Sequence, residues 1–439
     1  MFVNGNNIRV NAHGPRSMLV YTTIFICVFA TYLLISLHLG ILNALPEIGD
    51  GQAYDSIAFN IANHRGFGHA WDDPNWRHPY LQDPQYQDLL SKLPHSGYYP
   101  DVYRPPAMPY LLALVYGVFG RNFAAWRLLS CAIMAGAATI AAAISAEFAG
   151  VLAAIITALL ILQCPALTWY SHFFLTESLA TFLLTLLAWT WLRNTKRGWT
   201  TRGAAGLGIV LGALVATRNI FLLWVPILPF FVPAIPTPSG LNNFWRGKAI
   251  CLSTSLLILS PWVTRNIIVT KEFMPFGAQA QMELLAGFSP QALQARGLWQ
   301  QIDEGQYQDS SWVMDPVDFQ VRLAKFHSSA AAHWMIEHPF DVMRLMVLHV
   351  WHEVEPRSGA ASEWLLFLGA LSAFVFRKSH GVGLIVLFVA LNILSIALTW
   401  SVGGRFMVPV QPLIVALVGA MVSRQLTASL QQNSGPTTS

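Results

Sequence analysis

Residues 18–39 read MLVYTTIFICVFATYLLISLHL, an apolar stretch without a single Asp, Glu, Lys or Arg. A helix needs about 20 apolar residues to cross the hydrocarbon core of a bilayer. The stretch follows Arg16, and the next Asp, Glu, Lys or Arg in the sequence is Glu47. This segment is too long for the apolar core of a cleaved signal peptide, so we predict a retained first membrane-spanning helix.

The composition excludes a water-soluble globule. Hydrophobic residues make up 54% of the chain and charged residues only 11%, whereas soluble domains carry about 25% charged residues. The net charge of +4 is scattered between apolar stretches without a long basic run, so no nucleic-acid partner is predicted. Four cysteines have no paired metal or redox spacing, and we interpret them as small core residues: Cys27, Cys131, Cys164 and Cys251.

Nine further apolar segments have the length and composition expected of spans. The fold class predicted from them is an all-α polytopic membrane protein with about ten transmembrane helices and extracytoplasmic loops. The nine segments are residues 128–145, 150–169, 178–192, 203–217, 220–235, 249–263, 364–376, 382–400 and 406–423.

The distribution of charge predicts the orientation, because Lys and Arg favour the cytoplasmic side. If residues 105–119 do not span, one side holds both termini and a single acid, Glu147, while the other holds eight carboxylates in 47–101 and twelve in 272–363. We therefore predict that 105–119 form an interfacial or re-entrant helix on the outer face, and that both termini are cytoplasmic. The cytoplasmic basic residues would be Arg9, Arg16, Arg193, Lys196, Arg197, Arg202, Arg246, Lys248, Arg377, Lys378 and Arg424.

The same reasoning divides the chain into four parts. Residues 1–264 form an N-terminal transmembrane module that includes the outer loop 42–104 and the interfacial helix 105–119. Residues 265–362 form an extracytoplasmic segment, and residues 363–424 supply the C-terminal transmembrane helices. Residues 425–439 end in a polar, low-complexity sequence and are predicted to be a disordered tail.

Charged groups near membrane depth are costly and therefore mark candidate sites. Asp50 follows the first helix, Glu177 lies at the outer mouth of another, and four arginines lie near outer span ends, where a guanidinium can clamp a phosphate: Arg127, Arg218, Arg265 and Arg405. Each has an alternative interpretation as a solvated loop acid, a helix cap or a residue reaching to lipid headgroups. Four outer-loop histidines match no compact metal motif: His64, His69, His78 and His95.

Several short motifs resemble the GT-C glycosyltransferases, in particular the branch of protein O-mannosyltransferases and lipid A aminoarabinose transferases. The resemblance covers most of the chain in order. The matching motifs are GDGQAY at 49–54, ANHRGFG at 62–68, RPPAMPYLLA at 104–113, FG at 119–120, RL at 127–128, LTESL at 175–179, PW at 261–262, RN at 265–266 and RFMVP at 405–409.

The resemblance implies an inverting membrane glycosyltransferase that uses a polyprenyl-phosphate sugar donor on the extracytoplasmic face. It implies that Asp50 is the general base towards an acceptor hydroxyl and that Glu177 is the second family acid. The acceptor would be a lipid, a glycan or a protein, and the membrane a bacterial inner membrane with its lipids as further partners. The residues expected to bind substrate are Tyr54, Arg104, Arg127, Arg218, Arg265 and Arg405.

The sequence departs from the family pattern in one place and leaves two other classes open. Gly51 stands where many relatives carry a second acid, which argues against a strong divalent-metal site; a divalent cation is the one cofactor left open. A transporter or lipid flippase would require ionisable residues near the midplane, and the predicted spans contain almost none. A membrane subunit that only scaffolds other proteins would not depend on Asp50.

Overall fold

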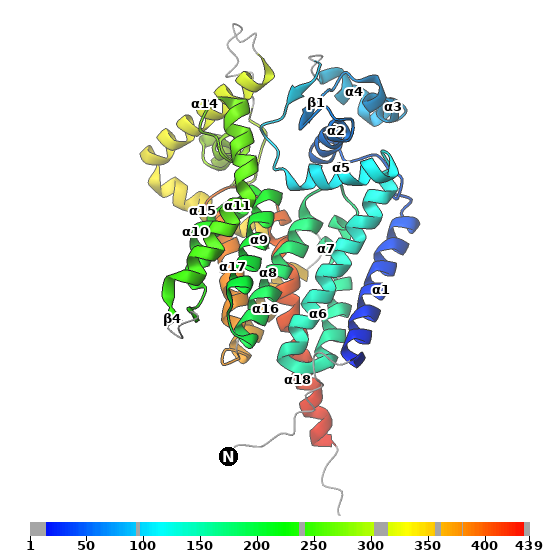
Figure 1. Cartoon of the computed structure of the whole chain (residues 1–439), viewed down its shortest axis with the longest axis vertical. Helices are drawn as coiled ribbons and strands as arrows, with labels where there is room; N and C mark the ends of the chain where they lie inside the picture. The colour runs from blue at the N-terminus through cyan, green and yellow to red at the C-terminus, as the bar shows by residue number, and fades with distance from the viewer. Residues whose placement is uncertain are drawn as a thin grey trace, which may run out of the picture.

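The computed structural model describes residues 15–93, 97–236, 242–302, 315–355, 361–379 and 381–433. Arg9, His95 and residues 434–439 of the predicted tail lie outside these residues. The described chain is a bundle of helices with two helical lobes at one end, so the predicted all-α class is confirmed (Figure 1).

The bundle runs along the long axis of the molecule (Figure 1). Its regular helices are α1 (Pro15–His38), α6 (Phe123–Leu162), α7 (Pro165–Tyr170), α8 (Glu177–Arg197), α9 (Thr201–Thr217), α11 (Phe244–Thr270), α16 (Ala361–Val375), α17 (Val382–Ala397) and α18 (Gln411–Asn433). The largest cluster of buried apolar side chains lies between these helices.

The two polar excursions form the two lobes, called the first and the second lobe in chain order, and they lie together at one end of the bundle (Figure 1). The first contains α2 (Asp50–Ala62), β1 (Gly68–His69), α3 (Pro74–Leu81), α4 (Pro84–Lys92), β2 (Tyr99–Pro100) and α5 (Ala107–Phe119). The second contains α12 (Gln279–Gly287), α13 (Pro290–Gln294), α14 (Pro316–Glu337) and α15 (Pro339–Val354). Figure 1 shows α5 lying across the end of the bundle rather than along it.

The long helix α6 is a hairpin of two antiparallel halves. Ala149 and Gly150 have non-helical backbone angles, and Gly150 has φ 80°. Ser145 Oγ lies 3.3 Å from the carbonyl oxygen of Ala153, although eight residues of continuous helix would separate them by about 12 Å. The two halves correspond to the predicted segments 128–145 and 150–169, and the second half ends at Leu162.

Within the described residues, four helical stretches are long and apolar enough to cross a membrane, as expected of an integral membrane protein: Met18–His38, Phe123–Leu162, Phe244–Thr270 and Arg405–Gln432. Five shorter apolar helices accompany them, namely Ala107–Phe119, Thr201–Thr217, Asn219–Phe231, Leu365–Val375 and Val382–Ala397. The structure therefore shows the apolar bundle, while the predicted count of ten spans stays a prediction.

The predicted span 220–235 differs from a regular helix. It consists of the short helices η1 (Asn219–Leu223), α10 (Trp224–Ile227) and η2 (Leu228–Phe231), followed by β3 (Ile235–Pro236), which pairs with β4 (Asn242–Asn243). Proline has no backbone N–H and clashes with the preceding turn, so Pro226 and Pro229 prevent one continuous helix here. The 3₁₀ helix η4 (Arg405–Val410) leads into α18.

The end of the bundle away from the lobes gathers residues predicted to be cytoplasmic. Lys196 at the end of α8 forms an ion pair with Glu147 near the α6 turn. The guanidinium of Arg424 lies over the ring of Phe376, 5.7 Å from its centroid. Helix α18 continues to Asn433, so residues 425–433 of the predicted disordered tail are helical.

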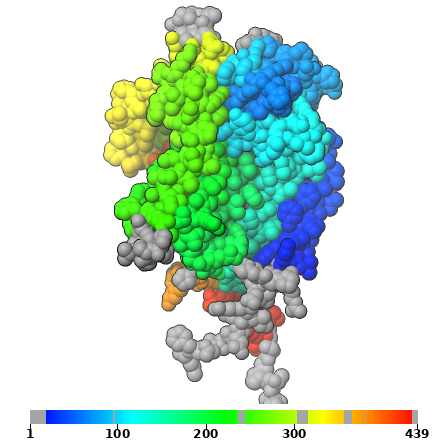
Figure 2. Space-filling view, viewed as in Figure 1, coloured from blue at the N-terminus to red at the C-terminus, as the bar shows by residue number. Residues whose placement is uncertain are grey.

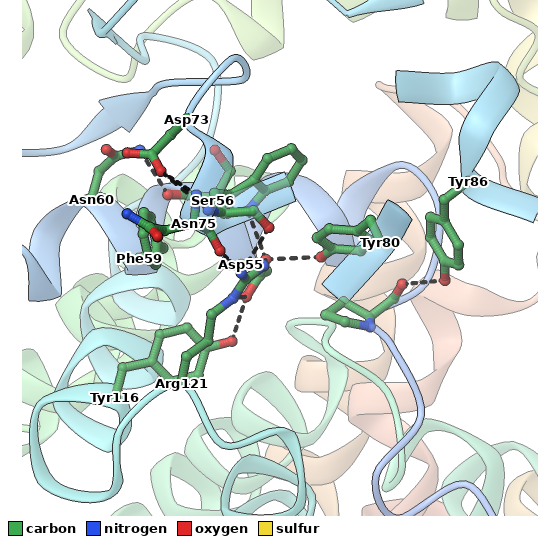
Figure 3. A network of polar contacts seen from close by, with 12 residues as sticks. Asp55, Ser56, Phe59, Asn60, Asp73, Asn75, Tyr80, Tyr86, Tyr116 and Arg121 are labelled. Atoms are coloured by element: carbon green, nitrogen blue, oxygen red, sulfur yellow. Dashed lines mark hydrogen bonds and ion pairs between the residues drawn. The ribbon is translucent and has the colours of Figure 1, made fainter. Parts of the chain in front are cut away.

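A buried carboxylate fixes α2 relative to its neighbours (Figure 3). Asp55 is fully buried and accepts hydrogen bonds from Trp76 Nε1 at 2.8 Å, Tyr80 OH at 2.8 Å and Tyr116 OH at 2.6 Å. Arg121 Nε donates a further bond at 3.0 Å. A buried charge is tolerated only when it is paired and hydrogen-bonded, so this network ties α3 and α5 to the helix that carries Asp50.

Candidate active site

Asp50 is the first residue of α2, and its position depends on the turn before it. The preceding residue, Gly49, has φ 92°, a conformation that favours glycine. The loop from α1 to this turn is held by Arg127, whose guanidinium donates to the carbonyl oxygens of Leu42, Ala44 and Leu45. The Asp50 carboxylate therefore projects from a fixed helix start.

Two arginines bind the two oxygens of Asp50. Arg104 Nη1 donates to Oδ1, and Arg405 Nη1 donates to Oδ2 at 2.8 Å. Burial by itself would raise the pKa of Asp50, but the charges and hydrogen bonds of the two guanidiniums outweigh it and hold this pKa below its usual range. Asp50 is therefore an ionised carboxylate at neutral pH, with a guanidinium on each of its two oxygens.

Glu177 contacts the same group of charged side chains through Arg405. Its Oε1 accepts hydrogen bonds from Arg405 Nε and from Arg218 Nη1, the latter at 3.1 Å. The Glu177 side chain is fully buried, and within the described residues its Oε2 has no hydrogen-bond partner. Arg405 thus bridges Asp50 and Glu177. The result is a continuous chain of alternating charges, Arg104, Asp50, Arg405, Glu177 and Arg218.

A cavity of about 300 Å³ opens beside this chain of charges. It is lined from both lobes and from the end of the bundle, by Gly49, Asp50, Tyr54, Tyr103, Arg104, Pro105, Thr176, Thr217, Arg218, Asn219, Ile220, Gln279, Glu283, Trp299, Trp400, Val402, Arg405 and Phe406. Three aromatic rings support the arginines: the Arg104 guanidinium lies 5.5 Å from the Tyr54 centroid and 4.8 Å from that of Tyr103, and the Arg218 guanidinium lies 4.9 Å from that of Phe406.

The fold of this chain is also found in solved structures of other proteins. No protein-family model and no curated protein matches the sequence. The oligosaccharyltransferase of Archaeoglobus fulgidus in its apo form aligns over 95% of this chain and 52% of its own, with 14% sequence identity and a TM-score of 0.51. The chain has the GT-C fold. It spans about half the length of that neighbour.

Two further solved structures align less well. One is the archaeal oligosaccharyltransferase AglB from Archaeoglobus fulgidus in complex with an inhibitory peptide and a dolichol-phosphate, with 15% identity, a TM-score of 0.49, and coverage of 97% of this chain and 53% of that one. The other is ArnT from Cupriavidus metallidurans bound to undecaprenyl phosphate, with 13% identity, a TM-score of 0.40, and coverage of 94% and 79%.

Packing explains why the residue after Asp50 is a glycine, Gly51. A Cβ atom on Gly51 would lie 2.6 Å from Glu47 Oε2 and 3.3 Å from Phe174 Cβ. Glu47 Oε2 itself accepts a hydrogen bond from the Phe174 backbone N–H at 2.9 Å. Glu47 therefore occupies the space that a second acid next to Asp50 would need.

The donor set does not suit a divalent cation. Within the described residues, no group of three or more His, Cys, Asp or Glu side chains is placed to hold a metal ion. Asp50 and Glu177 are bridged by Arg405, so a guanidinium stands between the two carboxylates.

The loop that carries Arg405 is held by a carboxylate that the sequence did not single out. Glu353 in α15 is buried and accepts hydrogen bonds from Ser401 Oγ at 2.9 Å, Val402 N at 2.9 Å and Phe406 N at 2.7 Å. Burial raises the pKa of Glu353, against the opposing effect of these donors. The loop can turn towards Glu353 because Gly404 adopts φ 95°. Glu353 is thus a positioning residue for Arg405.

The structure does not bring all the predicted residues together. Tyr54, Arg104, Arg218 and Arg405 line the cavity with Asp50, and Glu177 contacts two of these arginines. Arg127 and Arg265 lie away from the cavity lining and donate to backbone carbonyls instead. Arg265 holds Asp101 O at 2.6 Å and Phe67 O at 2.9 Å. Both arginines support the loops that bear the site, and their predicted substrate contact stays a prediction.

Glu283 in α12 is a further carboxylate of the cavity. Its two oxygens accept hydrogen bonds from Tyr103 OH and Trp299 Nε1, and burial raises its pKa. No sequence signal distinguishes Glu283 from the other eleven acids between 272 and 363, because its place at the cavity arises only when the second lobe packs against the first.

Proposed function

We propose that this protein is a membrane glycosyltransferase that moves a sugar from a polyprenyl-phosphate donor to an acceptor hydroxyl on the extracytoplasmic face. The observation that carries the proposal is the chain of alternating charges beside a cavity at the end of an apolar bundle. Four residues of the family-like motifs, Asp50, Arg104, Glu177 and Arg405, meet there.

The charges suit transfer from a phosphodiester. In the proposed step, the acceptor oxygen attacks the anomeric carbon while Asp50 takes the hydroxyl proton, and the bond between that carbon and the phosphate oxygen breaks. The electron pair leaves with the lipid phosphate, and attack from the opposite face inverts the anomeric centre. Arg405, Arg104 and Arg218 stabilise the phosphate as its charge develops.

The balance of charge in the set supports this assignment. Three guanidiniums face two carboxylates in the chain from Arg104 to Arg218, which leaves one positive charge for the single negative charge of a phosphodiester. The donor phosphate would compete with Asp50 for Arg405. The base would then be released from one of its two cations when donor binds, and its proton affinity would rise at that moment.

The location suits a lipid-borne donor. The cavity is lined by residues of both lobes and of the adjoining end of the bundle, so a phosphate can reach the arginines while its isoprenoid chain stays among apolar helices. We propose a bacterial inner membrane, with both termini cytoplasmic and the lobes outside. The acceptor is a lipid, glycan or protein hydroxyl.

The test is transfer of a labelled sugar. Purified protein in lipid nanodiscs is incubated with undecaprenyl-phosphate hexoses and pentoses carrying a radiolabel, together with membrane extract as the acceptor source, and the labelled product is identified. Wild type should form a new glycosidic product. The Asp50→Asn variant, which keeps size but cannot accept the proton, should be about 100-fold to 10,000-fold slower.

The matched control is Asp88→Asn, which changes an exposed carboxylate of the same lobe that pairs with Lys92. It should transfer sugar at the wild-type rate. Failure of wild type to transfer any label, or an Asp50→Asn variant that binds donor and works at a near wild-type rate, would contradict the proposal. In sealed proteoliposomes, movement of labelled lipid from one leaflet to the other without a new glycosidic bond would instead support a flippase.

A further inference from the structure

The wall of the cavity formed by the second lobe differs in chemistry from the arginine wall. The second lobe presents the carboxylate of Glu283, the amide of Gln279 and the indole ring of Trp299, and the adjoining end of the bundle adds the amide of Asn219 and the indole ring of Trp400. Asn219 Nδ2 lies 3.3 Å from Gln279 Oε1 and links two of these groups. Planar rings pack against the C–H faces of a sugar, and carboxylates and amides pair with its hydroxyl groups.

This wall is fixed relative to the arginines. The N–H of Ala278, at the start of α12, donates to Val102 O at 2.7 Å, and Val102 lies two residues before Arg104. A Cβ on the adjacent Gly277 would collide with the same carbonyl oxygen, so the two backbones are in direct contact. Figure 2 shows the second lobe in green and yellow packed against the first in blue and cyan.

The opposite end of the wall is tied to the loop that carries Arg405. The backbone N–H of Trp299 donates to Ser401 O at 2.7 Å, four residues before Arg405. The Trp299 indole N–H then donates to Glu283. Both edges of the second-lobe wall are therefore anchored to segments that bear donor-binding arginines.

Tyr103 contacts both Arg104 and Glu283. Its ring lies against the Arg104 guanidinium, while its hydroxyl donates to Glu283. Tyr103 thus contacts both the guanidinium proposed to bind the phosphate and the carboxylate of Glu283, so these two groups are neighbours across one side chain. The negative charge of Glu283 would repel the phosphate of the donor. A neutral part of the donor would therefore lie at the Glu283 end of the cavity.

The Glu283 carboxylate can accept more hydrogen bonds than the two it receives from Tyr103 and Trp299. A carboxylate has about four acceptor positions, and Tyr103 and Trp299 occupy one on each oxygen. The two donors hold the group in one orientation. The remaining positions are available to hydroxyl groups in the cavity, and such a preorganised acceptor discriminates strongly against a ligand that lacks the hydroxyl.

We infer that Glu283, oriented by Tyr103 and Trp299, binds hydroxyl groups of the transferred sugar and makes the site prefer a sugar-charged polyprenyl phosphate over the bare lipid phosphate. The inference rests on the proposed function, since it assigns the sugar end of the same donor. It makes Glu283 a specificity-determining residue, with Asp50 as the base.

The experiment compares the binding of two kinds of probe to the full-length protein in nanodiscs. The probes are undecaprenyl phosphate and a set of undecaprenyl-phosphate hexoses and pentoses, and the tightest conjugate is used for the variants. Wild type should prefer that conjugate to the bare lipid. Glu283→Gln should reduce the preference about 10-fold or more and leave affinity for undecaprenyl phosphate within about 2-fold of wild type.

Three further variants make the result specific. Glu272→Gln alters a carboxylate of the same segment that pairs with Lys325 on the surface, and it should keep the full preference. Trp299→Phe keeps a ring but removes the N–H that orients Glu283, so it should reduce the preference by less than Glu283→Gln does. Arg405→Ala should weaken binding of both probes, which tests the proposed phosphate site independently.

The inference is overturned if Glu283→Gln keeps the wild-type preference, if it weakens both probes equally, or if wild type binds no conjugate better than the bare lipid. It is also overturned if Glu283→Gln abolishes transfer at saturating donor with binding unchanged, because Glu283 would then act as the base. In each case a loss of undecaprenyl phosphate binding in Arg405→Ala would still support the proposed donor site.

Discussion

At the scale of single residues, Arg405 has the widest influence on the site. Its guanidinium donates through Nη1 to Asp50 and through Nε to Glu177. A planar guanidinium presents donors in a fixed fork, whereas a lysine presents one mobile point charge. The geometry of this residue therefore determines how the two acids are held before donor arrives.

We predict that Arg405→Lys weakens binding of undecaprenyl phosphate about 10-fold, because an ammonium group cannot make the paired contacts of the fork. The measurement is a titration of purified protein in nanodiscs with a fluorescent undecaprenyl phosphate. Arg377→Lys is the control, because Arg377 is exposed at the other end of the bundle and donates to the carbonyl oxygen of Phe374. Wild-type affinity in both Arg405→Ala and Arg218→Ala would remove these arginines from the site.

The pH dependence of transfer should report the arginines around Asp50. Because Arg104 and Arg405 lower its pKa below the ordinary value of 3.8, the carboxylate stays ionised as pH falls towards that value, and activity is lost only below it. Wild-type kcat/KM should therefore change little on the acid side between about pH 7 and pH 5.

Arg104→Gln removes one of the two cations, so the pKa of Asp50 should rise and the acid limb of kcat/KM should move to higher pH. The profile is measured with the labelled donor under saturating acceptor. Arg377→Gln should leave the limb where it is in wild type. An acid limb that does not move in Arg104→Gln would show that Asp50 is not the group whose ionisation limits the reaction.

At the scale of elements, small residues allow the bundle helices to approach closely. Ser255 Oγ in α11 donates to Gly208 O in α9 at 3.0 Å, and a Cβ on Gly208 would collide with the Cys251 backbone carbonyl. Gly206, two residues earlier in the same helix, has nothing within 4 Å of its Cβ position. Membrane helices associate through such small-residue contacts because lipid supplies little hydrophobic drive between them.

Gly208→Ala should therefore destabilise the protein by about 1–3 kcal/mol, since α9 and α11 must move apart. Gly206→Ala should be neutral or stabilising by up to about 1 kcal/mol, because alanine is the better helix former and meets no neighbour. Thermal unfolding of the two variants in the same detergent provides the measurement. Equal melting temperatures would contradict the close contact between α9 and α11.

At the scale of the whole molecule, the site is assembled from segments that are remote in sequence. Asp50 and Arg405 are 355 residues apart, and Tyr103 and Glu283 are 180 apart. Both outer lobes and the end of the bundle contribute to one cavity. An orientation with the lobes outside would expose this cavity to extracytoplasmic acceptors.

That orientation predicts the result of reporter fusions. A reporter fused after Lys196, which lies in the end of the bundle away from the lobes, should read cytoplasmic, and one fused after Asp88 in the first lobe should read external. Alkaline phosphatase and green fluorescent protein, which are active on opposite sides, provide complementary readouts. A cytoplasmic signal after Asp88 would invert the proposed orientation.

The sequence by itself determined the features that depend on local pattern. Apolar stretches such as 18–39 predict bundle helices because the bilayer requires about 20 apolar residues whatever the neighbours are. The acids concentrated in residues 47–101 and 272–363 predicted two polar excursions on one side, and Figure 1 shows both at one end of the bundle. The family motifs identified Asp50, Glu177 and Arg405, which the structure brings into contact.

Only the tertiary structure decided which charges meet. Arg127 and Arg405 have similar positions near span ends, yet one binds loop carbonyls and the other bridges two acids. Glu353 and Glu283 became part of the site through packing of α15 and α12, which no local pattern encodes. The physical reason is that hydrophobic period and charge bias act over a few turns of chain, whereas an ion pair depends on where distant helices come to rest.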